Sequence, residues 1–110
     1  MLRKSMKIRE NAEITVIDVT EDLGNHVAVE LKQTLEAQNA LKIVMNLSEV
    51  KHISSTAIGA LVGVAMRLRR RGGDLKVYGL RDNIMRAFDL VGASGIVEIF
   101  STESSAAAAF

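Results

Sequence analysis

The sequence contains no cysteine and no proline, and it has few aromatic residues. Without cysteine the chain forms no disulfide, carries no thiolate nucleophile and lacks the ligands of cysteine zinc sites. This absence fits a reducing compartment, and we expect a cytoplasmic protein. Only three Phe and one Tyr are present, so the core must be aliphatic and surfaces for stacking nucleic-acid bases are missing.

An excess of charge and a long apolar run are also missing. There are 14 Lys and Arg against 13 Asp and Glu, whereas a general nucleic-acid binder usually has a clear basic excess. No window approaches the roughly 18 to 20 apolar residues of a membrane span. The basic first ten residues lack the continuous apolar segment of a signal peptide. We therefore expect no direct binding of nucleic acid and no membrane insertion.

The length of 110 residues predicts one domain over residues 1–110, with a modest core. Apolar runs predict strands over residues 6–10, 13–19, 41–47, 74–80 and 96–100. From Glu13 onward strands alternate with helices, which predicts the α/β class with a mixed, mostly parallel sheet of four to five strands. The first two strands are joined by a short turn at Asn11, so this pair is expected to be antiparallel.

Helical spacing predicts the segments between the strands. The expected helices span residues 25–38, 56–71, 81–93 and the chain end from 102. Asn25 is the expected N-cap of the first helix. Gly72 and Gly73 are expected to stop the second helix, and Gly92 to follow the third.

The helix over residues 56–71 has two different sides when about 100° is taken per residue. The side expected to face the core carries Ile58, Leu61, Val62, Ala65 and Leu68. The opposite side is small near its start and basic near its end, and it carries Gly59, Ala60, Gly63, Arg67 and Arg70.

The two glycines on that opposite side favour a contact surface. Each costs an exposed helix roughly 1 kcal/mol relative to Ala, which suggests that another backbone approaches closely. Because the helical wheel points Gly59 and Gly63 outward, a partner protein is favoured over an approach within the fold. The arginines at 67 and 69–71 suit the carboxyl end of a helix, and we expect them to be solvated.

Three consecutive hydroxyl residues, Ser54, Ser55 and Thr56, stand in the stretch KHISSTAIGAL at the amino end of this helix. A hydroxyl at this place caps free N–H groups, which contributes about 1 kcal/mol. The same place also suits a phosphoryl group, because unpaired N–H donors and the positive end of the helix dipole meet it. A phosphate would add nearly two negative charges beside the contact surface.

The residues from Ile43 onward resemble the STAS domain of sulfate transporters and anti-sigma factor antagonists. The family has a strand ending in D-L or N-L, an acidic and apolar link, and D-S-[ST]-G-[LI]-G at the start of a helix. Here NL at 46–47, SEV at 48–50 and SSTAIG at 54–59 match these parts, and residues 72–100 resemble the family's carboxyl half. The first 40 residues match more weakly, with TEDL at 20–23 in place of G-x-[LI]-D.

The resemblance implies a non-enzymatic bacterial signalling module with a STAS-like fold. Such an anti-sigma factor antagonist binds an anti-sigma factor that is a serine kinase, releases it when phosphorylated, and is reset by a phosphatase. By position, the acceptor is Ser55, with Thr56 as the adjacent hydroxyl. The expected partner-binding residues are Ser54, Gly59, Ala60, Gly63 and Arg67. The expected state is a monomer or a weak homodimer.

Two positions depart from the family motif. Ser54 stands where the family has Asp, which removes a charge beside the acceptor. Ala57 stands where the family has Gly, which narrows the backbone freedom of the turn. The alternative function is a non-phosphorylated scaffold of a stress-signalling assembly, or an accessory subunit of an ABC-type lipid or anion transporter.

Other chemistries find little support in the sequence. Ser55 and His52 are three residues apart, but no acid is placed to orient them for nucleophilic catalysis. The two histidines form no metal spacing, and no glycine loop for a nucleotide follows a strand. Asp18, Glu21 and Asp22 suggest a magnesium pocket, but the next strand ends in Asn46 where a phosphoacceptor Asp would be needed. We expect no enzyme activity, no metal and no cofactor.

Overall fold

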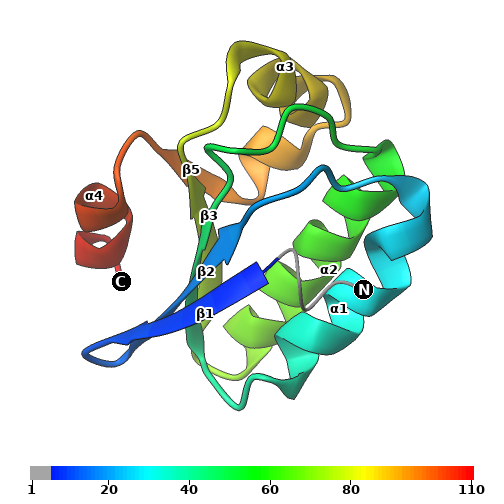
Figure 1. Cartoon of the computed structure of the whole chain (residues 1–110). Helices are drawn as coiled ribbons and strands as arrows, with labels where there is room; N and C mark the ends of the chain where they lie inside the picture. The colour runs from blue at the N-terminus through cyan, green and yellow to red at the C-terminus, as the bar shows by residue number, and fades with distance from the viewer. Residues whose placement is uncertain (1–5) are drawn as a thin grey trace.

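The computed structural model describes residues 6–110, which form a five-stranded sheet with helices on both faces (Figure 1). The strands lie in chain order: β1 (Met6–Asn11), β2 (Ile14–Val19), β3 (Lys42–Asn46), β4 (Asp74–Tyr78) and β5 (Glu98–Phe100). β1 and β2 are antiparallel and the other neighbours are parallel. The predicted fold class and the antiparallel first pair are confirmed. The basic start of the chain, for which we expect no signal peptide, lies partly outside the described residues.

The strand order decides where the helices lie. A crossover between parallel strands is almost always right-handed, and each of the three crossovers steps to the next strand in the same direction. All three crossover helices therefore lie on one face of the sheet: α1 (Ala28–Ala37), α2 (Ser55–Arg70) and α3 (Asp82–Leu90). The short helix α4 (Glu103–Ala108) covers part of the other face and contacts β3, β4 and β5 (Figure 1).

The predicted elements exist, and most of their ends differ by one to three residues from the prediction. The largest errors, of three residues each, are at the start of the first helix and at the end of the third, where α3 ends at Leu90. Residues Asn25–Val27 form a 3₁₀ turn, and α1 begins only at Ala28. No side chain caps either element, so the prediction that Asn25 is an N-cap was wrong. Here Gly24 takes the extended conformation at the start of the turn.

The main core lies between the sheet and the three crossover helices. It is aliphatic apart from Phe88, which is fully buried. The core side of α2 is rotated from the predicted side, because it includes Ala57 and Val64 while Val62 is only partly buried. The apolar stripe of such a helix is broad, so the sequence leaves open which line along the stripe points to the core. The elements that pack against α2, namely α1 and β4, decide that direction.

The second face of the sheet carries a smaller core and buried charge. Val16 and Val44 pack there against Ala106 of α4. Lys76 is 3% exposed on this face. Its ammonium group pairs with Asp74 at 3.2 Å and with Glu98, and it lies 4.9 Å from the centre of the Phe110 ring.

Two glycines end α2 as expected, each for its own reason. Gly72 has a φ of +85°, and its N–H donates to the carbonyl of Arg69 at 3.2 Å. The N–H of Gly73 donates to the carbonyl of Leu68 at 2.8 Å, which completes a Schellman motif. At Gly73 the chain also passes the backbone of Leu41 so closely that a Cβ atom would lie 2.0 Å from the Leu41 carbonyl oxygen.

Replacing Gly73 with Ala is therefore expected to destabilise the fold by roughly 1–3 kcal/mol, the usual cost of overpacking. The added methyl group meets backbone rather than a movable side chain, so β3 and the end of α2 must separate. Urea unfolding measures the change. The control is Gly95→Ala, where a Cβ atom meets nothing within 4 Å and the change in stability should stay within about 0.5 kcal/mol. Equal stabilities of the two variants would contradict the close approach at Gly73.

Candidate partner-binding site

The loop from Leu47 to Ser54 joins β3 to α2 and carries the predicted site to one edge of the sheet. Because β2, β3 and β4 are parallel, the segments that follow them leave the sheet at this same edge (Figure 1). Loops at the carboxyl ends of parallel strands are the usual place for binding sites in α/β folds. The start of α2 is therefore framed by residues from three separate parts of the chain.

Ser54 is the N-cap of α2. It has extended backbone angles, and its hydroxyl oxygen accepts the N–H of Ala57 at 3.0 Å. This confirms the prediction that one of the three hydroxyls is a cap. The oxygen that Ser54 offers to the helix is neutral, where the family's Asp would offer a charged one.

Ser55 and Thr56 are the first two residues of α2, and both are exposed. Neither hydroxyl group bonds to another residue in the part of the chain that the structure describes. Their backbone N–H groups belong to the first turn, which has no partners within the helix. A phosphoryl group on either hydroxyl would thus lie next to N–H donors and to the positive end of the helix dipole.

Asp22 and Leu23, which follow β2, hold the loop on one side. The Asp22 carboxylate accepts the N–H groups of Lys51 at 2.8 Å and of His52 at 3.1 Å. The hydrogen bond from Lys51, more than the one from His52, lowers the pKa of Asp22 against the opposing effect of burial. Leu23 adds a bridge to Ile53, since its N–H donates to His52 and its carbonyl accepts from Ser54 at 2.8 Å.

The sequence does not predict that Asp22 holds this loop. Its place in TEDL at 20–23, where the family has G-x-[LI]-D, is the one sign in the sequence that the residue has a particular role. The suggested magnesium pocket is not assembled, because Asp22 bonds to loop amides while Asp18 bonds to Arg9 and Asn46. Within residues 6–110 there is no group of three or more His, Asp or Glu side chains that could hold a metal ion.

The start of α3 and the end of β3 hold the other side of the loop. The Arg81 side chain donates to the carbonyl of Ser48 at 3.1 Å, and Asn83 donates to the carbonyl of Lys51 at 2.7 Å. Asn46 accepts both the N–H of Ser48, at 3.0 Å, and its hydroxyl, at 2.7 Å. The loop before α2 is thus fixed by side chains from the end of β3 and from the segments that follow β2 and β4.

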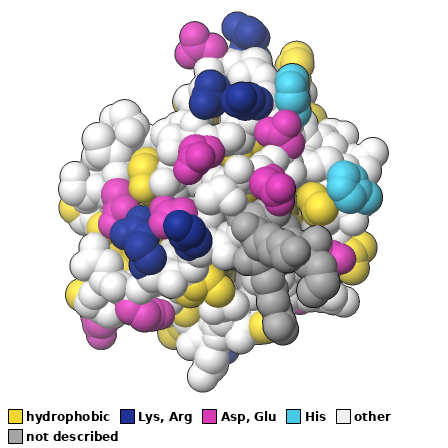
Figure 2. Space-filling model, viewed as in Figure 1, with side chains coloured by type: hydrophobic (Ala, Val, Ile, Leu, Met, Phe, Trp, Pro, Cys, Tyr) yellow, Lys and Arg dark blue, Asp and Glu magenta, His cyan; other side chains and the backbone are white. Residues whose placement is uncertain are grey.

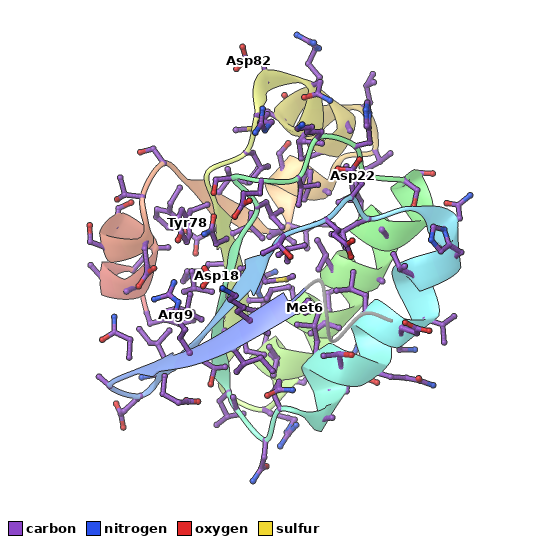
Figure 3. The ribbon with its side chains drawn as sticks, viewed as in Figure 1. Met6, Arg9, Asp18, Asp22, Tyr78 and Asp82 are labelled. Atoms are coloured by element: carbon purple, nitrogen blue, oxygen red, sulfur yellow. The ribbon has the colours of Figure 1, made fainter. Side chains whose placement is uncertain are left out.

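Asn46 also connects the loop to a charged network on the second face of the sheet. The Asn46 amide donates to Asp18 at 2.9 Å. Arg9 pairs with Asp18 at 2.6 Å and with Glu103 of α4 at 2.8 Å, and Tyr78 donates to Glu103 at 3.2 Å. Figure 3 shows Arg9, Asp18 and Tyr78 between the strands and α4, where basic and acidic groups gather in Figure 2.

The pKa values in this network follow from Arg9 and from burial. The hydrogen bond from Arg9 is the main reason that the pKa values of Asp18 and Glu103 are lowered. The pKa of Arg9 itself is raised by the same two carboxylates. Burial is the main reason that the pKa of Tyr78 is raised, and its bond to Glu103 adds to the shift. At neutral pH the network therefore holds both carboxylates ionised.

The residues predicted to bind a partner do not all lie on one exposed face of α2. Gly59 is exposed, and a Cβ atom there would meet nothing within 4 Å. Ala60 instead packs against the core, and Gly63 is half-buried beside the guanidinium group of Arg67. Arg67 turns toward α1, where its Nε atom lies 2.6 Å from a carboxylate oxygen of Glu36. The predicted outer side is therefore rotated toward α1.

The true outer face of α2 includes a residue that the sequence prediction missed. Met66 is 45% exposed and lies on the same side of the helix as Gly59. The arginine run keeps its expected exposure to solvent, with the side chains of Arg67 and Arg69 42% and 38% exposed, but these two also form ion pairs. Arg67 pairs with Glu36, and Arg69 pairs with Asp74 at 3.0 Å and donates to the Ile96 carbonyl.

The fold and this loop together are those of a STAS domain. The strands of the sheet lie in chain order, and one helix begins with consecutive hydroxyl residues. The chain belongs to this family, whose model, described as the STAS domain, matches residues 5–106. The resemblance seen in the sequence is thereby confirmed.

Among residues 6–110, no helix combines the length and the apolar content that crossing a bilayer requires.

Several of the proteins that this chain is similar to are named anti-sigma factor antagonists. An anti-sigma-B factor antagonist of Listeria monocytogenes is 31% identical over 89% of this chain and 88% of its own length. The anti-sigma-B factor antagonist of Bacillus subtilis is 24% identical over 86% of this chain and 89% of its own length. The crystal structure of an anti-sigma factor antagonist from Mycobacterium paratuberculosis has a TM-score of 0.82 at 20% identity, with 94% of this chain and 91% of that chain covered.

Replacing Asp22 with Ala should release the loop without unfolding the domain. The amide hydrogens of Lys51 and His52 lose a charged acceptor, and we expect them to exchange with solvent faster by roughly an order of magnitude. Hydrogen exchange followed by NMR measures this. The matched control is Glu49→Ala, which removes an exposed acid of the same loop that bonds to none of the described residues. Unchanged exchange in the Asp22 variant would show that the carboxylate does not hold the loop.

Proposed function

We propose that this chain is a cytoplasmic anti-sigma factor antagonist, a regulatory protein without catalytic activity that is switched by phosphorylation of Ser55. The observation that carries the proposal is the exposed Ser55 hydroxyl on the first turn of α2, next to a loop fixed from three sides. A kinase needs an accessible hydroxyl in a defined position, and this arrangement presents one. Thr56, also exposed, is the adjacent acceptor.

The partner is an anti-sigma factor with serine kinase activity, and a phosphatase restores the unmodified form. The names of the relatives from Listeria and Bacillus support the antagonist role. In this proposal the unmodified chain binds the kinase with the first turns of α2. Gly59 permits a close approach there because none of residues 6–110 fills the space above it.

Phosphorylation would act on the contact rather than on the fold. The modified Ser55 gains nearly two negative charges, which the free N–H groups and the helix dipole of α2 can accept. A partner docked against Ser55 and Gly59 would meet these charges directly and be repelled. Ser54 contributes the cap and no charge, so the response to phosphorylation rests on the phosphate alone.

Incubation with the cognate kinase and ATP is expected to place one phosphate on Ser55, mapped by mass spectrometry. The Ser55→Ala variant should lose most of the modification, whereas Ser104→Ala, an exposed serine on α4, should keep all of it. A protein that stays unmodified, and that instead co-purifies with a multi-subunit complex insensitive to phosphatase, would support the scaffold or transporter-subunit alternative.

A side chain added at Gly59 should weaken partner binding without lowering the stability of the free protein. Gly59→Ala is expected to stabilise the free protein by up to about 1 kcal/mol, because Ala is the better helix former and the added Cβ has no atom of the described residues within 4 Å to clash with. The affinity for the kinase should fall about tenfold, which is ~1.4 kcal/mol. Calorimetry measures both quantities, and Ser55→Asp should weaken binding in the same assay. Unchanged affinity in both variants would contradict docking on this face.

A further inference from the structure

A hollow lies between α1 and α2 at their carboxyl ends, far from Ser55. Both helices end on the same side of the molecule, where the chain returns to β3 and β4 (Figure 1). The hollow has a volume of about 330 Å³, within the range of small-molecule sites, roughly 300–1,000 Å³. With a rise of about 1.5 Å per residue, Ser55 and Arg70 lie roughly 22 Å apart along α2. A ligand in the hollow would therefore leave the phosphorylation site free.

The floor of the hollow is apolar. It is formed by Leu35 of α1 and by Val64 and Leu68 of α2, which are 2%, 2% and 6% exposed. Ala40, from the segment that leads to β3, adds an apolar group to the wall. This floor offers no hydrogen-bond partner from its side chains, so the part of a ligand that reaches it must be hydrocarbon.

The rim of the hollow carries excess positive charge. Arg67, Arg70 and Arg71 line it, and Glu36 is the one acidic residue among its lining residues. Arg70 and Arg71 pair with no carboxylate within residues 6–110. The carboxyl ends of α1 and α2 each supply about half a negative charge. Three guanidinium groups against Glu36 and the two helix dipoles leave about one positive charge at the rim.

Arg67 is also incompletely satisfied. Its Nε atom lies 2.6 Å from Glu36 and is shielded from solvent, but the N–H group is not aimed so as to form a hydrogen bond. A buried donor without an acceptor is costly. An anion entering the hollow would give this guanidinium group a further acceptor.

We propose that this hollow binds a small amphipathic acid, with its anionic head on the arginine rim and its hydrocarbon part on the leucine and valine floor. Guanidinium groups bind carboxylates and phosphates through paired, charge-assisted hydrogen bonds. Arg70 and Arg71 are free to supply these bonds, while burial of the hydrocarbon part contributes about 25 cal/mol for each Å² removed from water. The site is independent of the proposed phosphorylation switch.

The neighbouring hollow between the β1–β2 turn and β3 differs in chemistry. It is larger, about 620 Å³, and the charged residues that line it are Glu10, Glu13 and Lys42. Its lining therefore carries no excess of positive charge. The same acid should bind at the α1–α2 hollow and leave this second one empty, which makes the location of binding a part of the test.

Titration of the ¹⁵N-labelled, unphosphorylated protein with octanoate, followed by NMR, tests the proposal. Amide signals of Leu35, Val64 and Leu68, which line only this hollow, should shift in a saturable way, while those of Glu10 and Glu13 should not. Octyl phosphate should produce the same pattern, since the proposal requires an anionic head rather than a particular one. Octanol and inorganic phosphate, which each supply one half of the ligand, should bind at least about tenfold more weakly.

The double variant Arg70→Gln/Arg71→Gln should weaken octanoate binding at least tenfold, and its stability should change little because neither side chain has a partner in the described chain. Arg86→Gln, an exposed arginine of α3, is the matched control and should bind as the unaltered protein does. Absent shifts with octanoate, equal binding of octanol or of inorganic phosphate, or unaltered affinity in the double variant would each overturn the proposal. None of these outcomes depends on whether Ser55 is a phosphate acceptor.

Discussion

The right-handed crossover is the constraint on which this structure depends. Because the strands lie in chain order, every crossover steps the same way across the sheet, and α1, α2 and α3 must share one face. The other face is covered only in part, by the short helix α4, and the charged side chains on it must find partners among themselves. Lys76 is buried on this face and pairs with Asp74 and Glu98, since a charge removed from water needs partners, while the partly exposed Arg9 pairs with Asp18 and Glu103.

The same topology produces the site. Parallel strands send their following segments to one edge, so Asp22, Ser48 and Arg81 meet there although they are far apart in the chain. Their hydrogen bonds fix the loop before α2, and Ser54 fixes the first turn of the helix. The cap and the fixed loop together hold Ser55, the exposed first residue of α2, in a defined position.

The sequence predicted local features well and orientations poorly. The strands, the Gly72 and Gly73 stop and the hydroxyl cap depend on nearby residues, and the structure confirms them. The predicted outer face of α2 was displaced by part of a turn, so Ala60 and Arg67 were assigned to solvent although Ala60 packs against the core and Arg67 pairs with Glu36 of α1. An apolar stripe on a helix shows that a core side exists, but its width leaves the exact direction to the neighbours.

By itself the sequence determined the α/β class, the family and the place of the hydroxyl cluster at the start of a helix. These follow from periodicity, from turn residues and from a continuous motif. Only the tertiary structure decided that Asp22 holds the loop, that Asn46 joins it to Asp18, and that three arginines line a hollow with an apolar floor. Such sites are built from residues that are distant in the chain, and only the packing of the strands and helices brings them together.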